Sequence, residues 1–191
     1  MKPIEEFEAI AEEIFSVYLD ATEGFRQIAK MSEIFVNDKA RETGRDEKGV
    51  SPAGHVIYAL GCPEDGNYME LSARTGKEII EANAPDGKNF QFIASMAIVA
   101  LYQYWEDHYR EEIAAFLGKD KNALTLPIFG DLRKFRRAII HNRGRMIPEL
   151  KTLEVFVWEH NSAGDDRIGF GHENICAIWW EVKKALKKLT E

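Results

Sequence analysis

The chain has 191 residues, of which 45% are hydrophobic and 30% are charged, an ordinary balance for a folded globular protein. This length predicts one domain, or one domain with an elaborated insert. Lysine and arginine number 25 against 32 acidic residues, and the resulting net charge of −7 excludes a polybasic protein that coats nucleic acid with its whole surface. A local basic patch remains compatible with this balance.

The two cysteines, Cys62 and Cys176, lie too far apart in sequence to form a C-x-x-C redox pair or a zinc knuckle, so a reducing compartment is the simpler expectation. The N-terminal residues Met-Lys-Pro-Ile-Glu-Glu lack the apolar core of a signal peptide. The most apolar stretch, residues 90–105, contains several polar side chains, whereas a membrane span needs about 20 predominantly apolar residues. We therefore expect a cytoplasmic protein without a membrane partner.

The first element is a long amphipathic helix, predicted from about Pro3 to Met31 by apolar residues at helical spacing. From about residue 37 to residue 89 this periodicity fails, and glycines and prolines separate short apolar runs such as His55–Leu60 and Glu78–Ile80. The segment predicts an irregular insert made of loops with one or two short elements.

Two further helices follow the insert. The second is predicted over Phe90–Leu117, where Gly118 ends it, and the third runs from about Pro127 to Asn142 with Gly144 after its end. Each carries a stripe of apolar residues at helical spacing, which is typical of a helix packed on one face.

The last part of the chain predicts a β-hairpin and a final helix. Leu153–Trp158 is rich in β-branched and aromatic residues, and a turn cluster separates it from Arg167–Phe170. Apolar residues from Ile175 to Leu189 then repeat at helical spacing. The fold class expected is therefore mainly α: a helical bundle of about four main helices with a small β-hairpin before the C-terminal helix. We expect one domain over residues 1–191, with the insert at about 37–89.

One segment, Asp131–Arg145, differs from the acidic remainder because it holds one acid, Asp131, among six basic residues. The basic residues are Arg133, Lys134, Arg136, Arg137, Arg143 and Arg145. On an ideal helix Arg133, Arg137 and His141 repeat every four residues, so they form one stripe away from the core line. His141 falls in the last turn, where its ring can be accessible.

A histidine beside several guanidinium groups suits chemistry on a phosphodiester. Arginine offers paired donors to phosphate oxygens, and histidine can take or give a proton near neutral pH. This chemistry requires no metal ion. The alternative is a solvated helix face whose histidine only complements the helix dipole.

The run Arg136-Arg137-Ala138-Ile139-Ile140-His141-Asn142 resembles the Arg-x4-6-His motif of the HEPN superfamily. The following Asn142-Arg143-Gly144 is similar to the His-Asn-x-Gly of many bacterial members. HEPN domains are small α-helical bundles, often dimeric, and many are metal-independent ribonucleases of toxin–antitoxin, abortive-infection and other antiviral systems. In them the arginine and histidine of two protomers meet in a composite cleft at the dimer interface.

The resemblance implies a homodimer without cofactor or metal that cleaves RNA and that an antitoxin protein could restrain. Arg136 would bind or polarise the scissile phosphate, and His141 would act as general base or acid on the ribose 2′-hydroxyl. In the family the residue after the motif arginine is usually polar and often Asn, whereas here it is Arg137. Arg137 is also the second candidate for the motif arginine, because α-helical spacing pairs it with His141.

The substrate-binding residues expected beside this pair are Arg133, Arg137, Asn142, Arg143 and His108. If the helix over Phe90–Leu117 packs beside the motif helix, as the resemblance suggests, then His108, Arg110 and Glu106 line the same cleft. A metal site around His108 is disfavoured, because a di-iron bundle needs Glu-x-x-His pairs on two helices.

Two other functions remain open. The chain could be a HEPN-like module that holds RNA, a nucleotide or a partner protein without cleaving it, or a structural helical protein whose arginines are only solvated surface. The first two functions require Arg136, Arg137 and His141 to converge on one cleft. The structural alternative requires them to point apart into solvent.

Overall fold

The structure is a computed structural model that describes residues 2–43, 55–62, 67–156 and 166–190. Its contacts divide the chain into two compact units. One unit comprises Met1–Ala21 with Gln91–Glu191, and the other comprises Thr22–Phe90. Two helices cross the boundary: α1 (Pro3–Thr43) and α3 (Lys88–Tyr104).

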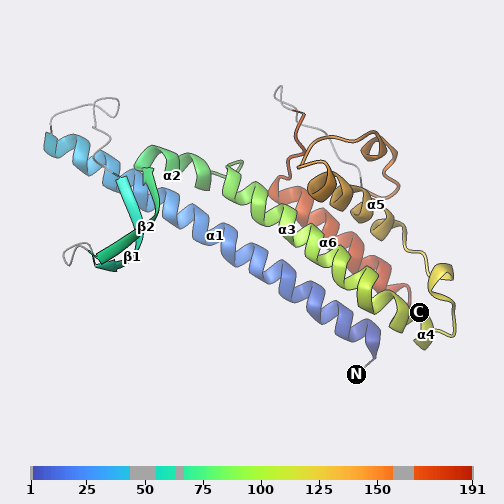
Figure 1. Ribbon diagram of the computed structural model, residues 1–191. Coiled ribbons are helices and arrows are strands. Elements are labelled where there is room, and N and C mark those ends of the chain that lie inside the picture. The colour runs from blue at the N-terminus through green and yellow to red at the C-terminus, as the bar shows by residue number, and fades with distance from the viewer. Residues whose placement is uncertain (1, 44–54, 63–66, 157–165, 191) are drawn as a thin grey trace. The chain divides into compact units, whose positions relative to one another are not determined.

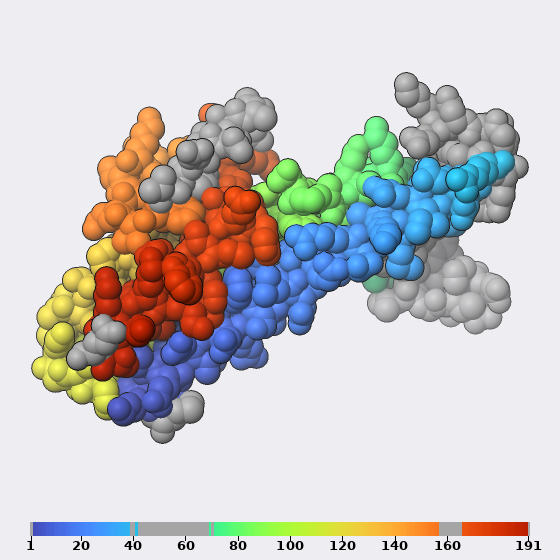
Figure 2. Space-filling model, turned by 180° about the vertical axis from the view of Figure 1, so that it is seen from behind, coloured from blue at the N-terminus to red at the C-terminus, as the bar shows by residue number. Residues whose placement is uncertain are grey.

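The first unit is a bundle of helices (Figure 1). It is formed by the N-terminal part of α1, by most of α3, and by α4 (Arg110–Phe116), α5 (Pro127–Arg136) and α6 (His172–Lys187). Figure 2 shows α6, in red, lying along the first part of α1, in blue. The predicted mainly α fold with about four main helices is confirmed, the four being α1, α3, α5 and α6.

Aromatic side chains form the centre of this bundle. The Phe7 ring lies 5.5 Å from Trp105 and 5.7 Å from Phe129, and the Trp105 and Phe129 rings stack at 4.0 Å. Phe135 of α5 meets Phe170 edge-on at 5.2 Å. All five are at least 97% buried, so these contacts fix α5 and Trp105, the residue that follows α3, against the start of α1.

A buried carboxylate ties the segment after α5 to that helix. The Asp131 side chain is fully buried and accepts hydrogen bonds from the backbone N–H groups of Glu154, Val155 and Phe156, at 2.9–3.1 Å. Lys134 lies 3.3 Å from the same carboxylate. The one acid of the basic segment therefore has a structural role.

The second unit contains the segment expected to be an irregular insert. Strands β1 (His55–Cys62) and β2 (Asn67–Thr75) pair antiparallel, from His55 opposite Thr75 to Cys62 opposite Asn67. Helix α2 (Gly76–Asn83) follows at once, and its capping box joins Thr75 and Glu78. The apolar runs at 55–60 and 78–80 do mark short elements, but the sequence analysis did not predict β2.

Helix α1 is longer than predicted, because it continues to Thr43 instead of ending near Met31. Its second part exposes large apolar side chains such as Met31 and Ile34, so the buried stripe that supported the prediction fades after the first unit. Gly76 lets the start of α2 approach this part of α1, since a Cβ at Gly76 would lie 2.6 Å from Val36. Within the described ranges, no helix is long and apolar enough to cross a membrane.

The hairpin predicted over Leu153–Phe170 lies partly outside the described residues, which omit 157–165. The described flanks at 153–156 and 166–170 form no strand. Arg167 instead makes an isolated antiparallel bridge with Arg145, which ties this segment to the turn after the motif helix.

Candidate functional site

Helix α5 carries the basic motif and begins as its sequence predicts. Pro127 occupies the first turn, where its missing N–H costs nothing, and Ile128, Leu132 and Phe135 are buried. This packing leaves Arg133 exposed and Arg136 half-buried on the other side of the helix. The bundle core therefore determines which arginines face outward.

The motif does not stay α-helical to its end. Residues Arg137–His141 form a π-helical turn, in which hydrogen bonds join residues five apart instead of four. The wider turn rotates His141 toward Arg136 relative to an ideal α-helix, so His141 lies between the directions of Arg136 and Arg137 on the helix surface. Arg136 and Arg137 therefore both stay candidates for the motif arginine, and both line the same cavity as His141.

The turn ends in two residues with left-handed backbone. Arg143 has φ 55° and Gly144 has φ 74°, and the Gly144 N–H donates to the carbonyl oxygens of Ala138 and Ile139 at 3.0 and 3.1 Å. This is a glycine-based helix stop. It holds His141 exposed at the last position of the helix.

Arg136 and His141 line one groove, which we call the arginine groove. Its volume is about 510 Å³. The groove is lined by Tyr102, Gly130, Arg133, Lys134, Arg136, Arg137, His141 and Glu149. Arg136, Arg137 and His141 thus line one groove, which is the arrangement that the two cleft-based functions need.

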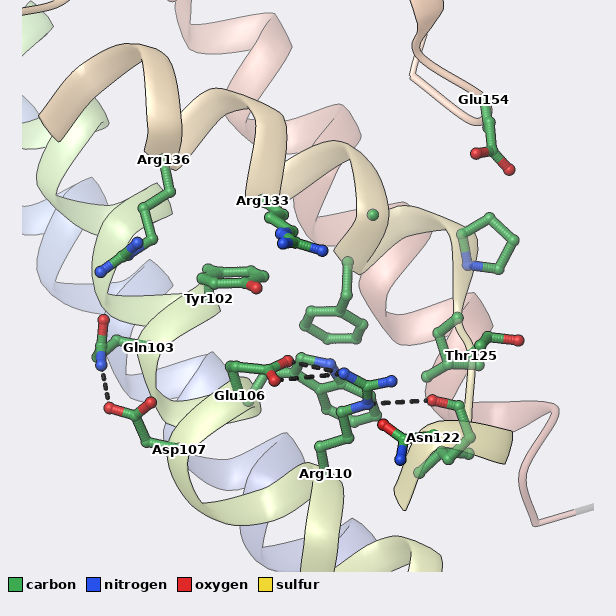
Figure 3. Close-up of a pocket in the computed structure, with 16 residues that line it drawn as sticks. Tyr102, Gln103, Glu106, Asp107, Arg110, Asn122, Thr125, Arg133, Arg136 and Glu154 are labelled. Atoms are coloured by element: carbon green, nitrogen blue, oxygen red, sulfur yellow. Dashed lines mark hydrogen bonds and ion pairs between the residues drawn. The ribbon is translucent and has the colours of Figure 1, made fainter. Parts of the chain in front are cut away.

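A second cavity continues from the arginine groove along α3, and we call it the polar pocket (Figure 3). Its volume is about 770 Å³. It shares Tyr102, Gly130, Arg133 and Arg136 with the arginine groove. The other polar side chains on its walls are Gln103, Glu106, Asp107, Arg110, Asn122, Thr125 and Glu154.

Arg136 stands at the junction of the two cavities. Its guanidinium lies 5.8 Å from the centre of the Tyr102 ring, and its Nε is buried with no hydrogen-bond partner among the described residues. Neither Arg136 nor Arg133 forms an ion pair within the part of the chain that the structure describes. A half-buried guanidinium without an acid partner is well suited to bind an anion.

The other basic side chains of the groove are already paired. Arg137 Nη1 lies 2.6 Å from Glu149 Oε1, and both side chains are substantially exposed. Lys134 Nζ donates to the Thr152 carbonyl oxygen at 2.6 Å in addition to its contact with Asp131. The groove therefore contains two unpaired guanidinium groups, Arg133 and Arg136, within the described ranges.

Tyr102 and Glu149 are groove residues that the sequence analysis missed, and Tyr102 is the one in contact with Arg136. Burial, together with the nearby Glu106 carboxylate, raises the pKa of its phenol, although Arg133, Arg136 and Arg110 act in the opposite direction. The neutral phenol presents its ring face to Arg136. The available signal was the spacing of Tyr102, Glu106 and Arg110, which repeat every four residues along one helix face.

Three predicted substrate contacts do not line either cavity. His108 is exposed and lies 3.5 Å from Glu112, with its ring edge-on to Tyr109. The Asn142 side chain donates to the Arg137 carbonyl oxygen at 3.4 Å, and Arg143 is exposed in the left-handed turn. No three metal-ligating side chains gather within the described ranges.

Glu106 and Arg110, which the resemblance placed in the cleft, do line the polar pocket. Arg110 Nη1 lies 3.0 and 3.3 Å from the two Glu106 carboxylate oxygens, and its Nε donates to the Leu124 carbonyl oxygen at 3.2 Å (Figure 3). This ion pair fixes the wall of the pocket that faces Arg133 and Arg136. Gln103 and Asp107 form a second hydrogen-bonded pair on the same wall.

No family model, curated protein or solved structure matches this chain.

Proposed function

We propose that the chain is a HEPN-like, metal-independent endoribonuclease that uses Arg136 and His141. The observation that carries this proposal is the convergence of two guanidinium groups, unpaired among the described residues, and one accessible histidine on the arginine groove. A phosphodiester supplies the anion that the guanidinium groups lack. The histidine can exchange a proton at neutral pH beside that anion.

The reaction assigned to the site is an internal transesterification. His141 takes the proton of the ribose 2′-hydroxyl, the 2′-oxygen attacks phosphorus, and the bond to the 5′-oxygen breaks. Arg136 stabilises the additional negative charge on the phosphoryl oxygens. The leaving 5′-oxygen takes up a proton, so the products are a 2′,3′-cyclic phosphate end and a 5′-hydroxyl end.

A symmetric dimer completes this proposal. The reaction needs a base for the 2′-hydroxyl and an acid for the leaving oxygen, whereas His141 is the one histidine that lines the groove within the described ranges. The same residue of a second copy would supply the other group. The cellular setting proposed is a toxin–antitoxin or phage-defence system, as the resemblance to HEPN ribonucleases implies.

The test is cleavage of end-labelled RNA by the purified protein in excess EDTA. We expect the native chain to cut, and His141→Ala and Arg136→Ala to lose activity by at least 100-fold. Arg145→Gln is the matched control, because Arg145 is exposed in the same basic segment and lines neither cavity. Equal cutting by His141→Ala and the native chain would remove the assigned site.

Non-catalytic binding is the second candidate, and one observation favours it. Arg137, at the position where the family usually has a polar residue and often Asn, is held by Glu149. A protein that binds RNA through Arg133 and Arg136 without cutting it would show binding lost in Arg136→Ala and no product with either RNA end labelled. This result would replace the ribonuclease proposal.

A further inference from the structure

The polar pocket is large enough for more than a phosphate group. Its volume of about 770 Å³ falls within the range of about 300–1,000 Å³ typical of small-molecule sites. It opens directly beside Arg136, which also lines the arginine groove. A ligand whose phosphate is bound by Arg136 would therefore place the group attached to that phosphate in the polar pocket.

The two cavities differ in their balance of charge. In the arginine groove, Glu149 is the one carboxylate among four cationic side chains, namely Arg133, Lys134, Arg136 and Arg137. In the polar pocket three arginines face three carboxylates, which are Glu106, Asp107 and Glu154. The cationic cavity suits a phosphate, and the balanced cavity suits a neutral polar group such as a nucleic-acid base.

Asp107 is an acceptor on the walls of the polar pocket that is only partly used, and it differs in this from Glu106 on the same helix. Both Glu106 oxygens contact Arg110, which holds that carboxylate in place. Asp107 is exposed, and one of its oxygens accepts a hydrogen bond from Gln103. Its second oxygen has no partner among the residues that the structure describes. In Figure 3 Asp107 lies beside Gln103, on the side of the pocket opposite Arg133, and Gln103 lies between Asp107 and Arg136 in this view.

We propose that the polar pocket binds the base next to the phosphate held by Arg136, and that Asp107 accepts a hydrogen bond from an exocyclic amino group of that base. This inference rests on the proposed function, since it takes RNA as the ligand of the arginine groove. Cytosine, adenine and guanine carry such an amino group, whereas uracil presents a carbonyl oxygen in its place. A carboxylate that meets a carbonyl oxygen gains no hydrogen bond and repels it.

Cytosine and uracil oligonucleotides give the sharpest test, because they share backbone charge and ring size and differ at this group. Binding of 5′-labelled 12-residue oligo(C) and oligo(U) is measured by fluorescence anisotropy in EDTA at pH 7.5 and one salt concentration. The His141→Ala chain is used to prevent cleavage. We expect oligo(C) to bind about tenfold more tightly than oligo(U), the effect of one hydrogen bond to a charged group.

Asp107→Asn is expected to reduce this preference to less than threefold, because it removes the charge while keeping the size of the side chain. Glu111→Gln is the matched control: Glu111 is exposed, carries the same charge and lines neither cavity. The control is expected to keep the preference for oligo(C).

Equal binding of the two oligonucleotides, both lost in Arg136→Ala, would overturn base selection and leave the proposed function standing. A preference for oligo(C) that survives in Asp107→Asn would overturn the role of Asp107. Failure of both oligonucleotides to bind would overturn this inference, and the cleavage assay on mixed-sequence RNA would then decide the proposed function separately.

Discussion

The Arg136 guanidinium lies over the Tyr102 ring, 5.8 Å from the ring centre, and this contact joins the motif helix α5 to α3 across the site. The side chain is half-buried, so its stem is held by packing while its charged end faces both cavities. An aromatic face can orient a guanidinium and leave its charge unneutralised, whereas a carboxylate would neutralise that charge. Arg136 is thus positioned and still available to an anion.

The first prediction concerns the contribution of the Arg136–Tyr102 contact to RNA binding. Tyr102→Leu removes the ring face and is expected to weaken binding of a short RNA oligonucleotide by about 3- to 10-fold, in line with a cation–π contribution of about 1 kcal/mol. Tyr102→Phe keeps the ring and is expected to stay within twofold of the native value. Anisotropy in the His141→Ala background measures both. Equal losses in the two variants would point to the hydroxyl group instead.

Arg136 and Arg137 are adjacent in sequence but have different interactions. The second prediction distinguishes their contributions to RNA cleavage. Arg137 is engaged by Glu149 at 2.6 Å, whereas Arg136 has no ion pair among the described residues. Arg136→Lys keeps the charge but loses the paired donors, and it is expected to reduce RNA cleavage by at least tenfold. Arg137→Lys is the matched variant and is expected to reduce cleavage by less than threefold. The reverse order would make Arg137 the motif arginine.

Much of the fold follows from patterns in the sequence, because burial on one helix face leaves a clear period. Gly118 and Gly144 end their helices as predicted, with φ of 67° and 74°. The end of α1 was missed because its second part, in the other unit, exposes Met31 and Ile34 and so carries no continuous buried stripe. Strand β2 was missed although Met69, Leu71 and Ala73 alternate with Glu70, Ser72 and Arg74, which is the two-residue period of a strand.

In the candidate site, too, sequence patterns predicted some features and not others. Composition and spacing identified Arg133, Arg136, Arg137 and His141, which do share one groove. The π-helical turn at Arg137–His141 could not be predicted, because nothing in the residue types distinguishes four-residue from five-residue spacing there. The pairing of Arg137 with Glu149 depends on the fold of residues between the motif and the short helix at 148–152, which local patterns do not specify.

Tyr102 gives the third prediction, which concerns pH. Burial raises its phenol pKa above the ordinary value of 10.0, so the folded protein holds this proton more tightly than the unfolded chain does. As pH rises above about 10 the unfolded chain loses protons first, and the free energy of unfolding falls. Tyr109, whose pKa is also raised by burial, adds to this effect. Urea denaturation from pH 9 to pH 11 should show the decline, and Tyr102→Phe should make it shallower.

The fourth prediction concerns the buried carboxylate of Asp131. Asp131→Ala leaves three backbone N–H groups without their acceptor and removes the ion pair with Lys134, and we expect it to lower the free energy of unfolding by about 3 kcal/mol or more. Asp131→Asn keeps one acceptor and should cost less. Urea denaturation measures both. Glu154→Gln, at an exposed carboxylate 4.0 Å from Lys134, is the control and should stay within about 0.5 kcal/mol.

The fifth prediction concerns the turn that ends the motif. Gly144 has φ 74°, where a Cβ is strained although nothing lies within 4 Å of its position, so Gly144→Ala is expected to lower the free energy of unfolding by about 1 kcal/mol. Gly24 lies inside α1 without positive φ and with open space around it, and Gly24→Ala should raise stability by about 0.5–1 kcal/mol. If the two Gly→Ala substitutions change the free energy of unfolding in opposite directions, the difference is due to the backbone conformation at the two glycines. If Gly144→Ala were neutral in urea denaturation, the left-handed turn after His141 would not be fixed by glycine.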